Sequence, residues 1–436
     1  MEDELIEMEG HAKRELKREL ALNYNLEQVI ADLVDNSIDA GAENIWVNFN
    51  EEEYTNSNSF YVMVVDDGLG IKSDAISSVM NFGAPRKYNE LELGKFGVGM
   101  KSSSLSQAKE ITLFSKTRDE SINLRRLSTE IVLESDKWAL ISKVRKHMKS
   151  KAYKIAKEQL QDLNSGSVIL LQDMHKLKHR IGNEANKDAY LIDEYGHIRE
   201  YLGLVFQRYI DGVKLKHSNG KIIERKIKIF FNGKDSVHQI KSLDPFCKSL
   251  KDGSVTGTLS KDFPVQLDDG NTIHNLEVSI WITPNHVNRG KEYDDRIDKA
   301  ARYAGISELQ GLYIYRNERL IDFPGWKKIV KLDPHYTCVR WEIKFPPSLD
   351  DAFQLDPSKR EIQLPRVFFD QLAKIARTSL RWHPDDQKTQ NHRARAKIRQ
   401  NGKDKRPAIK PPTPGPAPGD PPTTPPKGNS TPVVVP

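Results

Sequence analysis

Residues 31–42 read ADLVDNSIDAGA, and the interpretation of the N-terminal half of the chain depends on this stretch. Apolar residues with helical spacing are interrupted here by three carboxylates and one amide within eight residues. Asp32 and Asn36 are four residues apart, so they lie on one face of the predicted helix and point at one place. A carboxylate and an amide that converge suit a water molecule and a hard cation such as Mg²⁺. Such a pair is often only a polar helix face, so its meaning depends on the motifs that follow.

Two glycine-containing motifs follow in order. VVDDGLGI places Asp66 at the end of a strand predicted over 60–65, with Gly68 and Gly70 in the turn after it. A buried carboxylate there suits an exocyclic amino group, and the glycines let the backbone approach a flat ring closely. LGKFGVGMKSS then supplies glycines and lysines ahead of a small-residue helix, whose N–H groups would hold phosphate. Each motif alone is common in turns, but together they predict a nucleotide-binding site.

The rest of the chain alternates strand and helix patterns. Helical periodicity is predicted over 12–40, over a Lys-rich solvated insertion at 138–163, and over a closing helix at 365–382. Further strands of the first block are predicted over 45–49, 110–116 and 166–174. A second block begins near Tyr190 with a helix, and its strands are KIKIFFNG, HNLEVSIWIT, GLYIYRNERLI and CVRWEIKFP.

The composition excludes several classes of protein. The 436 residues are 37% hydrophobic and 29% charged, and no apolar run approaches the roughly 20 residues that span a bilayer. The charged N-terminus does not resemble a signal peptide. Cys247 and Cys338 have neither the number nor the spacing of a disulfide framework or a zinc site. We therefore expect a protein of the reducing cytoplasm without a membrane partner.

The net charge of +6 is uneven along the chain. Residues 388–410 contain nine Lys or Arg and one acid, Asp404, whereas the rest is close to neutral. This basic run either binds DNA or RNA phosphate or is a solvated linker, and no aromatic residue within it favours base stacking. The proline-rich residues that follow are predicted to be disordered or polyproline-like.

Taken together, the motifs resemble those of the GHKL superfamily, which contains gyrase, heat-shock chaperone, histidine kinase and MutL-type ATPases. ADLVDNSIDAGA matches the N-box, DDGLG the adenine-binding turn and GKFGVGMKSSSLS the glycine lid. FGAPRK (82–87) and the transducer-like segments GLYIYRNERLI, WEIKFPPSLDDAF and LDPSKREIQLP are most similar to MORC-type and related bacterial ATPases. The resemblance covers most of residues 20–365.

This resemblance implies a fold and a domain order. An α/β sandwich, with a mixed sheet covered by helices on one face, would bind ATP within residues 1–185. A smaller α/β transducer domain with a closing helix would occupy 186–384, followed by the basic and then proline-rich tail over 385–436.

Site residues are also implied by the resemblance. Asn36 would bind Mg²⁺ between the phosphates, and Asp66 would accept a hydrogen bond from the adenine amino group. Ser167 occupies the place of a family Thr that helps to hold this aspartate and a water. Lys359 would reach the γ-phosphate, with Arg360 as a competitor for that role. The other residues expected to contact ATP are Asp39, Gly68, Gly70, Lys87, Gly94, Lys95, Phe96, Gly97, Val98, Gly99, Met100 and Lys101.

One departure from the family bears on catalysis. The usual general base is a Glu four residues before the Asn, and this chain has Asp32 there. Because its side chain is one methylene shorter and reach decides proton transfer, we expect Asp32 to activate water slowly.

The sequence thus predicts an ATP-dependent switch that dimerises through its ATP-binding domains and hydrolyses ATP slowly. The resemblance places such proteins in DNA-directed or phage-defence settings, and we expect a separate effector protein because no nuclease, protease or methyltransferase motif is visible. A non-hydrolysing ATP sensor is the open alternative. A histidine kinase would need a phosphoacceptor ahead of the N-box, where His11 is the only histidine, and a chaperone would need a longer chain.

Overall fold

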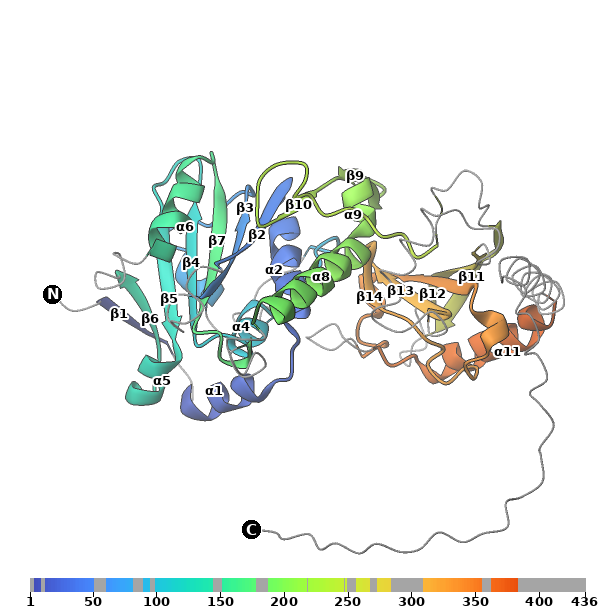
Figure 1. The fold of residues 1–436 in the computed structure, drawn as a ribbon. Coiled ribbons are helices and arrows are strands. Elements are labelled where there is room, and N and C mark those ends of the chain that lie inside the picture. The colour runs from blue at the N-terminus through green and yellow to red at the C-terminus, as the bar shows by residue number, and fades with distance from the viewer. Residues whose placement is uncertain are drawn as a thin grey trace, which may run out of the picture.

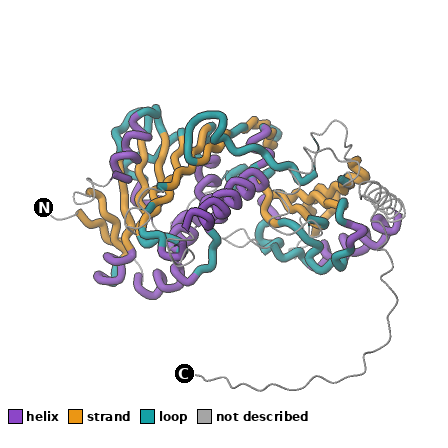
Figure 2. Tube along the Cα trace, viewed as in Figure 1, coloured by secondary structure: helices purple, strands orange, loops and turns teal. Residues whose placement is uncertain are grey.

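The computed structural model describes residues 4–8, 12–50, 60–80, 89–94, 99–143, 151–177, 187–217, 219–246, 248, 256–266, 273–283, 309–354 and 362–382. Two sheets lie on either side of the long helix α8 (Lys187–Val205), which runs between them (Figure 1). Figure 2 shows the strands gathered into these two groups, with helices packed beside each. Within these ranges, no helix combines the length and the apolar character needed to cross a membrane.

The larger sheet has eight strands in the order β1-β6-β5-β4-β7-β3-β2-β10. Its neighbours are antiparallel except for β10 and β2, which run parallel, so the sheet is mixed. The strands are β1 (Glu4–Met8), β2 (Asn44–Phe49), β3 (Tyr61–Asp66), β4 (Glu110–Lys116), β5 (Asn123–Ser128), β6 (Trp138–Lys143), β7 (Gly166–Gln172) and β10 (Lys228–Phe231).

Helices pack on both faces of this sheet. Val62 and Val64 of β3 point into a core shared with α1 (Ala12–Ala21), α2 (Leu26–Asp39) and α8. The alternate residues of β3 point the other way and pack against α6 (Lys151–Gln161). The expectation that helices cover one face only is therefore wrong. A strand buried on both faces is uniformly apolar, which explains why FYVMVV shows no alternation.

Short helices complete the first part of the molecule. They are α3 (Ile76–Met80), α4 (Gly99–Leu105), α5 (Thr129–Ser135) and α9 (Gln207–Asp211). After α9 the chain forms a two-stranded hairpin, β8 (Val213–Lys216) with β9 (Ile222–Arg225).

The smaller sheet has five strands in the order β11-β12-β15-β13-β14, and only β13 and β15 are parallel. Helix α11 (Arg366–Trp382) packs Phe368 and Leu372 against its core. Two 3₁₀ turns, Pro334–Tyr336 and Pro347–Leu349, flank β15. The strands are β11 (Thr256–Gln266), β12 (Ile273–Ile282), β13 (Gly311–Arg316), β14 (Arg319–Asp322) and β15 (Val339–Phe345).

Three predicted elements differ from the structure. The helix predicted over 12–40 is two helices, because Asn25 has extended backbone and its N–H donates to Gln28 Oε1 at 3.1 Å, a capping contact that starts α2. In the segment 138–163, Trp138–Lys143 forms β6 and the helix begins only at Lys151. The apolar, strand-forming residues of WALISK explain this difference.

GLYIYRNERLI is a hairpin rather than one strand. Asn317 and Glu318 both have positive φ, 46° and 63°, and form the turn between β13 and β14. Positive φ at both central positions is the geometry of a type I′ hairpin turn, which Asn favours. The turn matters below because it reaches the candidate site.

Strand β10 lies beyond residue 186 in the sequence but belongs to the first sheet. The predicted boundary between the ATP-binding and transducer domains after residue 185, and the predicted start of the tail at residue 385, stay predictions.

Candidate functional site

The buried carboxylate of Asp66 lies at the end of β3. Its Oδ1 accepts the N–H of Gly68 at 2.9 Å, and its Oδ2 accepts the hydroxyl of Ser37 at 3.2 Å. Burial raises the pKa of Asp66 to about 6, although the hydrogen bonds from Gly68 and Ser37 oppose the rise. At neutral pH the group is therefore a largely ionised acceptor with little access to water.

The turn after Asp66 needs glycine at two positions. A Cβ on Gly68 would lie 2.8 Å from the carbonyl oxygen of Ala40, and one on Gly70 would lie 2.1 Å from that of Lys116. Gly70 also has a φ of +72°. The N–H of Leu69 donates to the Ala40 carbonyl at 3.0 Å, so the turn is fixed against the end of α2. This contact brings Asp66 and the polar helix α2 together.

Ser167 lies opposite Asp66 in the β3–β7 pairing. Its hydroxyl is 3.0 Å from that of Ser115, which in turn accepts the N–H of Ile71 at 2.8 Å. The backbone of Ser167 also hydrogen-bonds to Asp66. A short polar relay therefore runs under the glycine turn and holds it in place.

The polar residues of α2 point in different directions. Asn36 is exposed, whereas Asp32 is buried. Asp35 is also buried, and its Oδ1 accepts Nε of Arg319 at 2.7 Å. Asp39 binds backbone N–H groups farther along the chain, as described next. This separation explains why one helix contains so many polar groups, because each has a different partner.

Asp39 holds the segment that leads into the glycine-rich stretch. Residues 89–94, here called the lid root, lead into the predicted glycine lid and include its first residue, Gly94. The two carboxylate oxygens of Asp39 accept the N–H groups of Leu93 and Gly94, each at 2.8 Å. The structure thus joins Asp39 and Gly94, two of the predicted ATP contacts, through a side-chain-to-backbone hydrogen bond, and their contact with ATP stays a prediction.

The β13–β14 hairpin contacts the lid root from the other side. Arg316 donates to the carbonyls of Glu92 and Leu93 at 3.0 and 3.3 Å. Asn317 donates to the carbonyls of Glu90 and Glu92 at 2.8 and 3.3 Å.

Two further contacts support this junction. Both carboxylate oxygens of Asp350 accept hydrogen bonds from Arg316, at 2.7 and 2.9 Å, which fixes the guanidinium. His217, after β8, lies 2.9 Å from the carboxylate of Glu90. The lid root is therefore bound by three separate parts of the chain.

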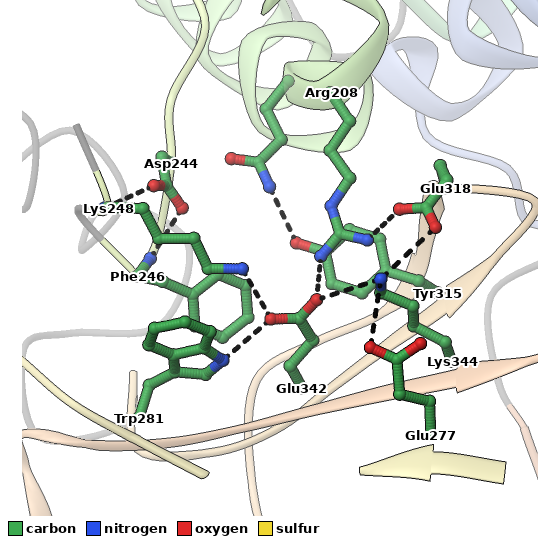
Figure 3. Close-up of polar contacts among 11 residues, drawn as sticks. Arg208, Asp244, Phe246, Lys248, Glu277, Trp281, Tyr315, Glu318, Glu342 and Lys344 are labelled. Atoms are coloured by element: carbon green, nitrogen blue, oxygen red, sulfur yellow. Dashed lines mark hydrogen bonds and ion pairs between the residues drawn. The ribbon is translucent and has the colours of Figure 1, made fainter. Parts of the chain in front are cut away.

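A second buried polar cluster joins α9 to the smaller sheet (Figure 3). Glu342 accepts hydrogen bonds from Arg208, Lys248 and the indole of Trp281, at 2.5, 2.6 and 2.8 Å. Burial raises the pKa of Glu342, but Arg208 and Lys248 outweigh it and the net shift is downward. The Arg208 guanidinium also lies 3.6 Å from the ring centre of Tyr315. This cluster fixes β13 and β15 relative to the helices of the first part.

Lys101 of α4 lies inside the protein. Its ammonium donates to the carbonyl of Val79, at the end of α3, at 3.1 Å, and burial lowers its pKa to about 8. Met100 is partly buried against the first core, and Gly99 begins α4. Lys101 is thus tied to α3, and its predicted contact with phosphate stays a prediction.

Several predicted residues lie outside the described part of the chain. They are Lys87, Lys95, Phe96, Gly97, Val98 and Lys359, together with the basic run 388–410.

The site fits magnesium only as a partner of a bound phosphate. Among the residues that the structure describes, no group of three or more His, Cys, Asp or Glu side chains could hold a metal ion. The exposed amide of Asn36, beside the buried Asp32, suits an ion that takes most of its ligands from phosphates and water.

Sequence reasoning missed the residues that support the site. Ser37, Ser115, Arg316, Asn317 and Arg319 all contact it or its lid root. One signal was available, since Asp35 falls on the apolar side of α2 and a buried acid needs a cationic partner.

Comparison with known proteins finds matches that include the N-terminal part of the chain. A family model described as histidine kinase-, DNA gyrase B-, and HSP90-like ATPase matches residues 24–162. MORC family CW-type zinc finger protein 1 of Mus musculus is 36% identical over 92 residues, and ATPase MORC2 of Homo sapiens is 35% identical over 92. The DNA mismatch repair protein MutL of Dictyoglomus turgidum is 29% identical over 134 residues.

These matches are partial on both sides. They cover 21% of this chain for each MORC protein and 28% for MutL. They cover 10% and 9% of the two MORC proteins and 22% of MutL, so the chain spans only a small part of the length of these relatives.

Proposed function

From the premise that the N-terminal region is a GHKL-type ATPase domain with distant MORC and MutL homologues, we propose that this chain is an ATP-driven conformational switch. The observation that carries the proposal is the buried carboxylate of Asp66 at the floor of a glycine turn, hydrogen-bonded to Ser37 of α2, the helix that also exposes the amide of Asn36. An ionised acceptor in a dry setting selects a donor such as the adenine amino group.

Asn36 is the residue that would hold Mg²⁺, which supplies charge neutralisation for the phosphates when bound. Asp32, one turn earlier on α2, would take a proton from the attacking water. Its burial and short side chain support slow hydrolysis. The same observation supports the second candidate, an ATP sensor that does not hydrolyse its ligand.

The contacts at the lid root support a transducer role for residues 186–384. Arg316 and Asn317 bind carbonyls of the segment that leads into the glycine lid, and Arg319 binds α2 through Asp35. A change in lid position that accompanies ATP binding would therefore move or strain the β13–β14 hairpin. ATP shifts the conformational equilibrium only by its different affinity for the two states.

Dimerisation through the ATP-binding domains, and a role with DNA or in phage defence alongside an effector protein, complete the proposal. A relative named for DNA mismatch repair supports the link to DNA. Two widely spaced cysteines favour the reducing cytoplasm as its location.

Calorimetry of the full chain with ATP and Mg²⁺ tests the central claim. We expect saturable heat for the wild type and at least a tenfold weaker affinity for Asn36→Ala. Gln161→Ala, which removes an exposed amide at the end of α6, on the face of the larger sheet opposite α2, serves as the matched control and should bind as the wild type does. Wild-type protein that takes up no ATP would refute the proposal.

Phosphate release then separates the ATPase from the sensor. We expect slow release by the wild type and none by Asp32→Asn, with ATP affinity retained within a factor of about three, because loss of a general base affects the chemical step. Equal release by both proteins would remove Asp32 from catalysis.

A further inference from the structure

The hairpin that follows α9 is far more basic than its surroundings. Residues 213–228, here called the basic hairpin, read VKLKHSNGKIIERKIK and contain six Lys or Arg and one Glu. All residues outside the run 388–410 together contain 58 Lys or Arg and 60 Asp or Glu. A positive segment within a slightly acidic body is an electrostatic feature that needs an explanation.

The cations are displayed on a fixed scaffold. Lys214 and Lys216 of β8 are exposed, while Leu215 between them is buried, so the strand presents its cations on one face. The N–H of Ile227 donates to Tyr209 at 2.9 Å, and that of Lys228 donates to Glu43 at 2.8 Å. These bonds and the pairing of β10 with β2 fix the base of the hairpin to the larger sheet.

A cavity of about 530 Å³ opens at this base. Lys214, Arg225, Lys226 and Lys228 line it, together with Asn44 and the acids Glu43 and Glu224. Lys214 pairs with Glu224 at 3.0 Å, which leaves the walls with an excess of positive charge. An arginine beside lysines in a concave site is the side-chain set that binds phosphate oxygens.

We propose that the basic hairpin binds the phosphate backbone of double-stranded DNA. The major groove of B-form DNA admits a two-stranded β-ribbon. Cations two residues apart on a strand are about 6.6–6.8 Å apart, so they reach successive backbone charges. The hairpin sequence contains no Phe, Tyr or Trp, so binding is independent of base sequence and does not depend on stacking.

Other anionic partners fit this surface less well. A membrane-binding surface presents several large apolar side chains beside its cations, whereas Ile222 is the one exposed large hydrophobic side chain among the described residues of the basic hairpin.

Fluorescence anisotropy of the full chain with a labelled random-sequence duplex tests the proposal. The test variant is Lys216→Glu, Lys226→Glu and Lys228→Glu, all exposed positions of the basic hairpin. The matched variant is Lys17→Glu, Lys137→Glu and Lys154→Glu, which changes net charge equally at exposed positions in other elements. Both variants retain the basic run 388–410, so its contribution is constant. The thermal unfolding of both is compared with the wild type.

We expect the hairpin variant to lose at least tenfold in affinity and the matched variant to lose less than threefold. The slope of log affinity against log salt should fall by about 2.7 for the hairpin variant, since each phosphate contact contributes about 0.9. Equal losses in the two variants would overturn the proposal. It would also be overturned if the hairpin variant kept its duplex affinity but lost binding to single-stranded DNA or to anionic vesicles.

Discussion

At the scale of single residues, Asp66 carries the most chemical information. Its carboxylate is buried at a strand end, yet it accepts hydrogen bonds from Ser37 and Gly68 and remains an acceptor at neutral pH. Burial raises its pKa to about 6, a pH at which few carboxylates titrate. Proton uptake by this one group should therefore be visible in ligand binding.

We predict that ATP affinity falls about tenfold per pH unit below pH 6, because the protonated acid no longer offers the adenine amino group a full acceptor. Calorimetry at pH 7.5, 6 and 5 measures this. Asp66→Asn is the control. ATP itself protonates equally in both experiments, so only the pH dependence of affinity that is due to Asp66 should disappear in this variant. Parallel pH profiles for the two proteins would contradict the assignment.

A loss of folding stability caused by protonation of Asp66 cannot explain a weaker affinity for ATP at low pH. A carboxyl whose folded-state pKa is raised contributes stability that is fully present below its unfolded pKa and is lost as pH rises through about 6. Acidification from pH 7 to 5 therefore stabilises the fold through this residue, while it weakens the binding of ATP.

At this scale, sequence reasoning could propose the residues that contact a ligand, but it could not find the residues that hold them in place. Asn36, Asp66 and the glycines fall in contiguous motifs, and the turn geometry at Gly68 and Gly70 is as the pattern predicts. Asp35 and Arg319 are 284 residues apart, so nothing local in the chain indicates their contact. Long-range partners become visible only when the sheets are assembled.

At the scale of elements, α2 and the β13–β14 hairpin are joined by a buried ion pair. The Asp35–Arg319 ion pair is almost fully buried, with side chains 1% and 2% exposed. Removing one member leaves an uncompensated charge in the interior, which costs far more than losing a surface pair.

We predict that Arg319→Met lowers the free energy of unfolding by about 3–5 kcal/mol. The double variant Asp35→Leu with Arg319→Met should be more stable than Arg319→Met alone, since it leaves no buried charge. Urea denaturation monitored by Trp fluorescence measures both. The control is Arg366→Ala, which removes an exposed i,i+4 pair with Asp370 on α11 and should cost about 0.3–0.5 kcal/mol.

Asn317 offers a gentler test of the same element. Its amide donates to two carbonyls of the lid root, so Asn317→Gly removes both bonds without burying a charge, and glycine tolerates the positive φ of this turn position. We predict a rise in the KM for ATP of about five- to tenfold with kcat changed less than twofold, because a loosened lid weakens binding but leaves Asp32 in place. Steady-state phosphate release measures both constants. A fall in kcat with unchanged KM would contradict a positioning role.

The elements themselves were only partly predictable. The strand over 110–116 is found at its predicted bounds, because its apolar, β-branched run is unambiguous. The break between α1 and α2 and the strand β6 were missed, because helical periodicity continues through the first and a Lys-rich context surrounds the second. Capping by Asn25 and pairing with β5 decided these two cases.

At the scale of the whole molecule, the proposed switch requires two chains. We predict that native mass spectrometry or light scattering shows a monomer without nucleotide and a dimer with a non-hydrolysable ATP analogue and Mg²⁺. Asn36→Ala should remain monomeric under both conditions, because it cannot hold the ion. A wild-type chain that stays monomeric with saturating analogue would exclude the dimeric switch.

The placement of β10 bears on how this protein can be divided. This strand comes from the second block of sequence, yet it covers the outer edge of β2, and Phe230 stacks on Trp46 with ring centres 5.9 Å apart. A fragment cut at the end of the motif-bearing region would present β2 as a bare, aromatic edge strand, a template for adhesion between copies. Any self-association of such a fragment would then result from the truncation and would not reflect the behaviour of the intact protein. Truncated variants should therefore keep the chain intact to residue 231 or beyond.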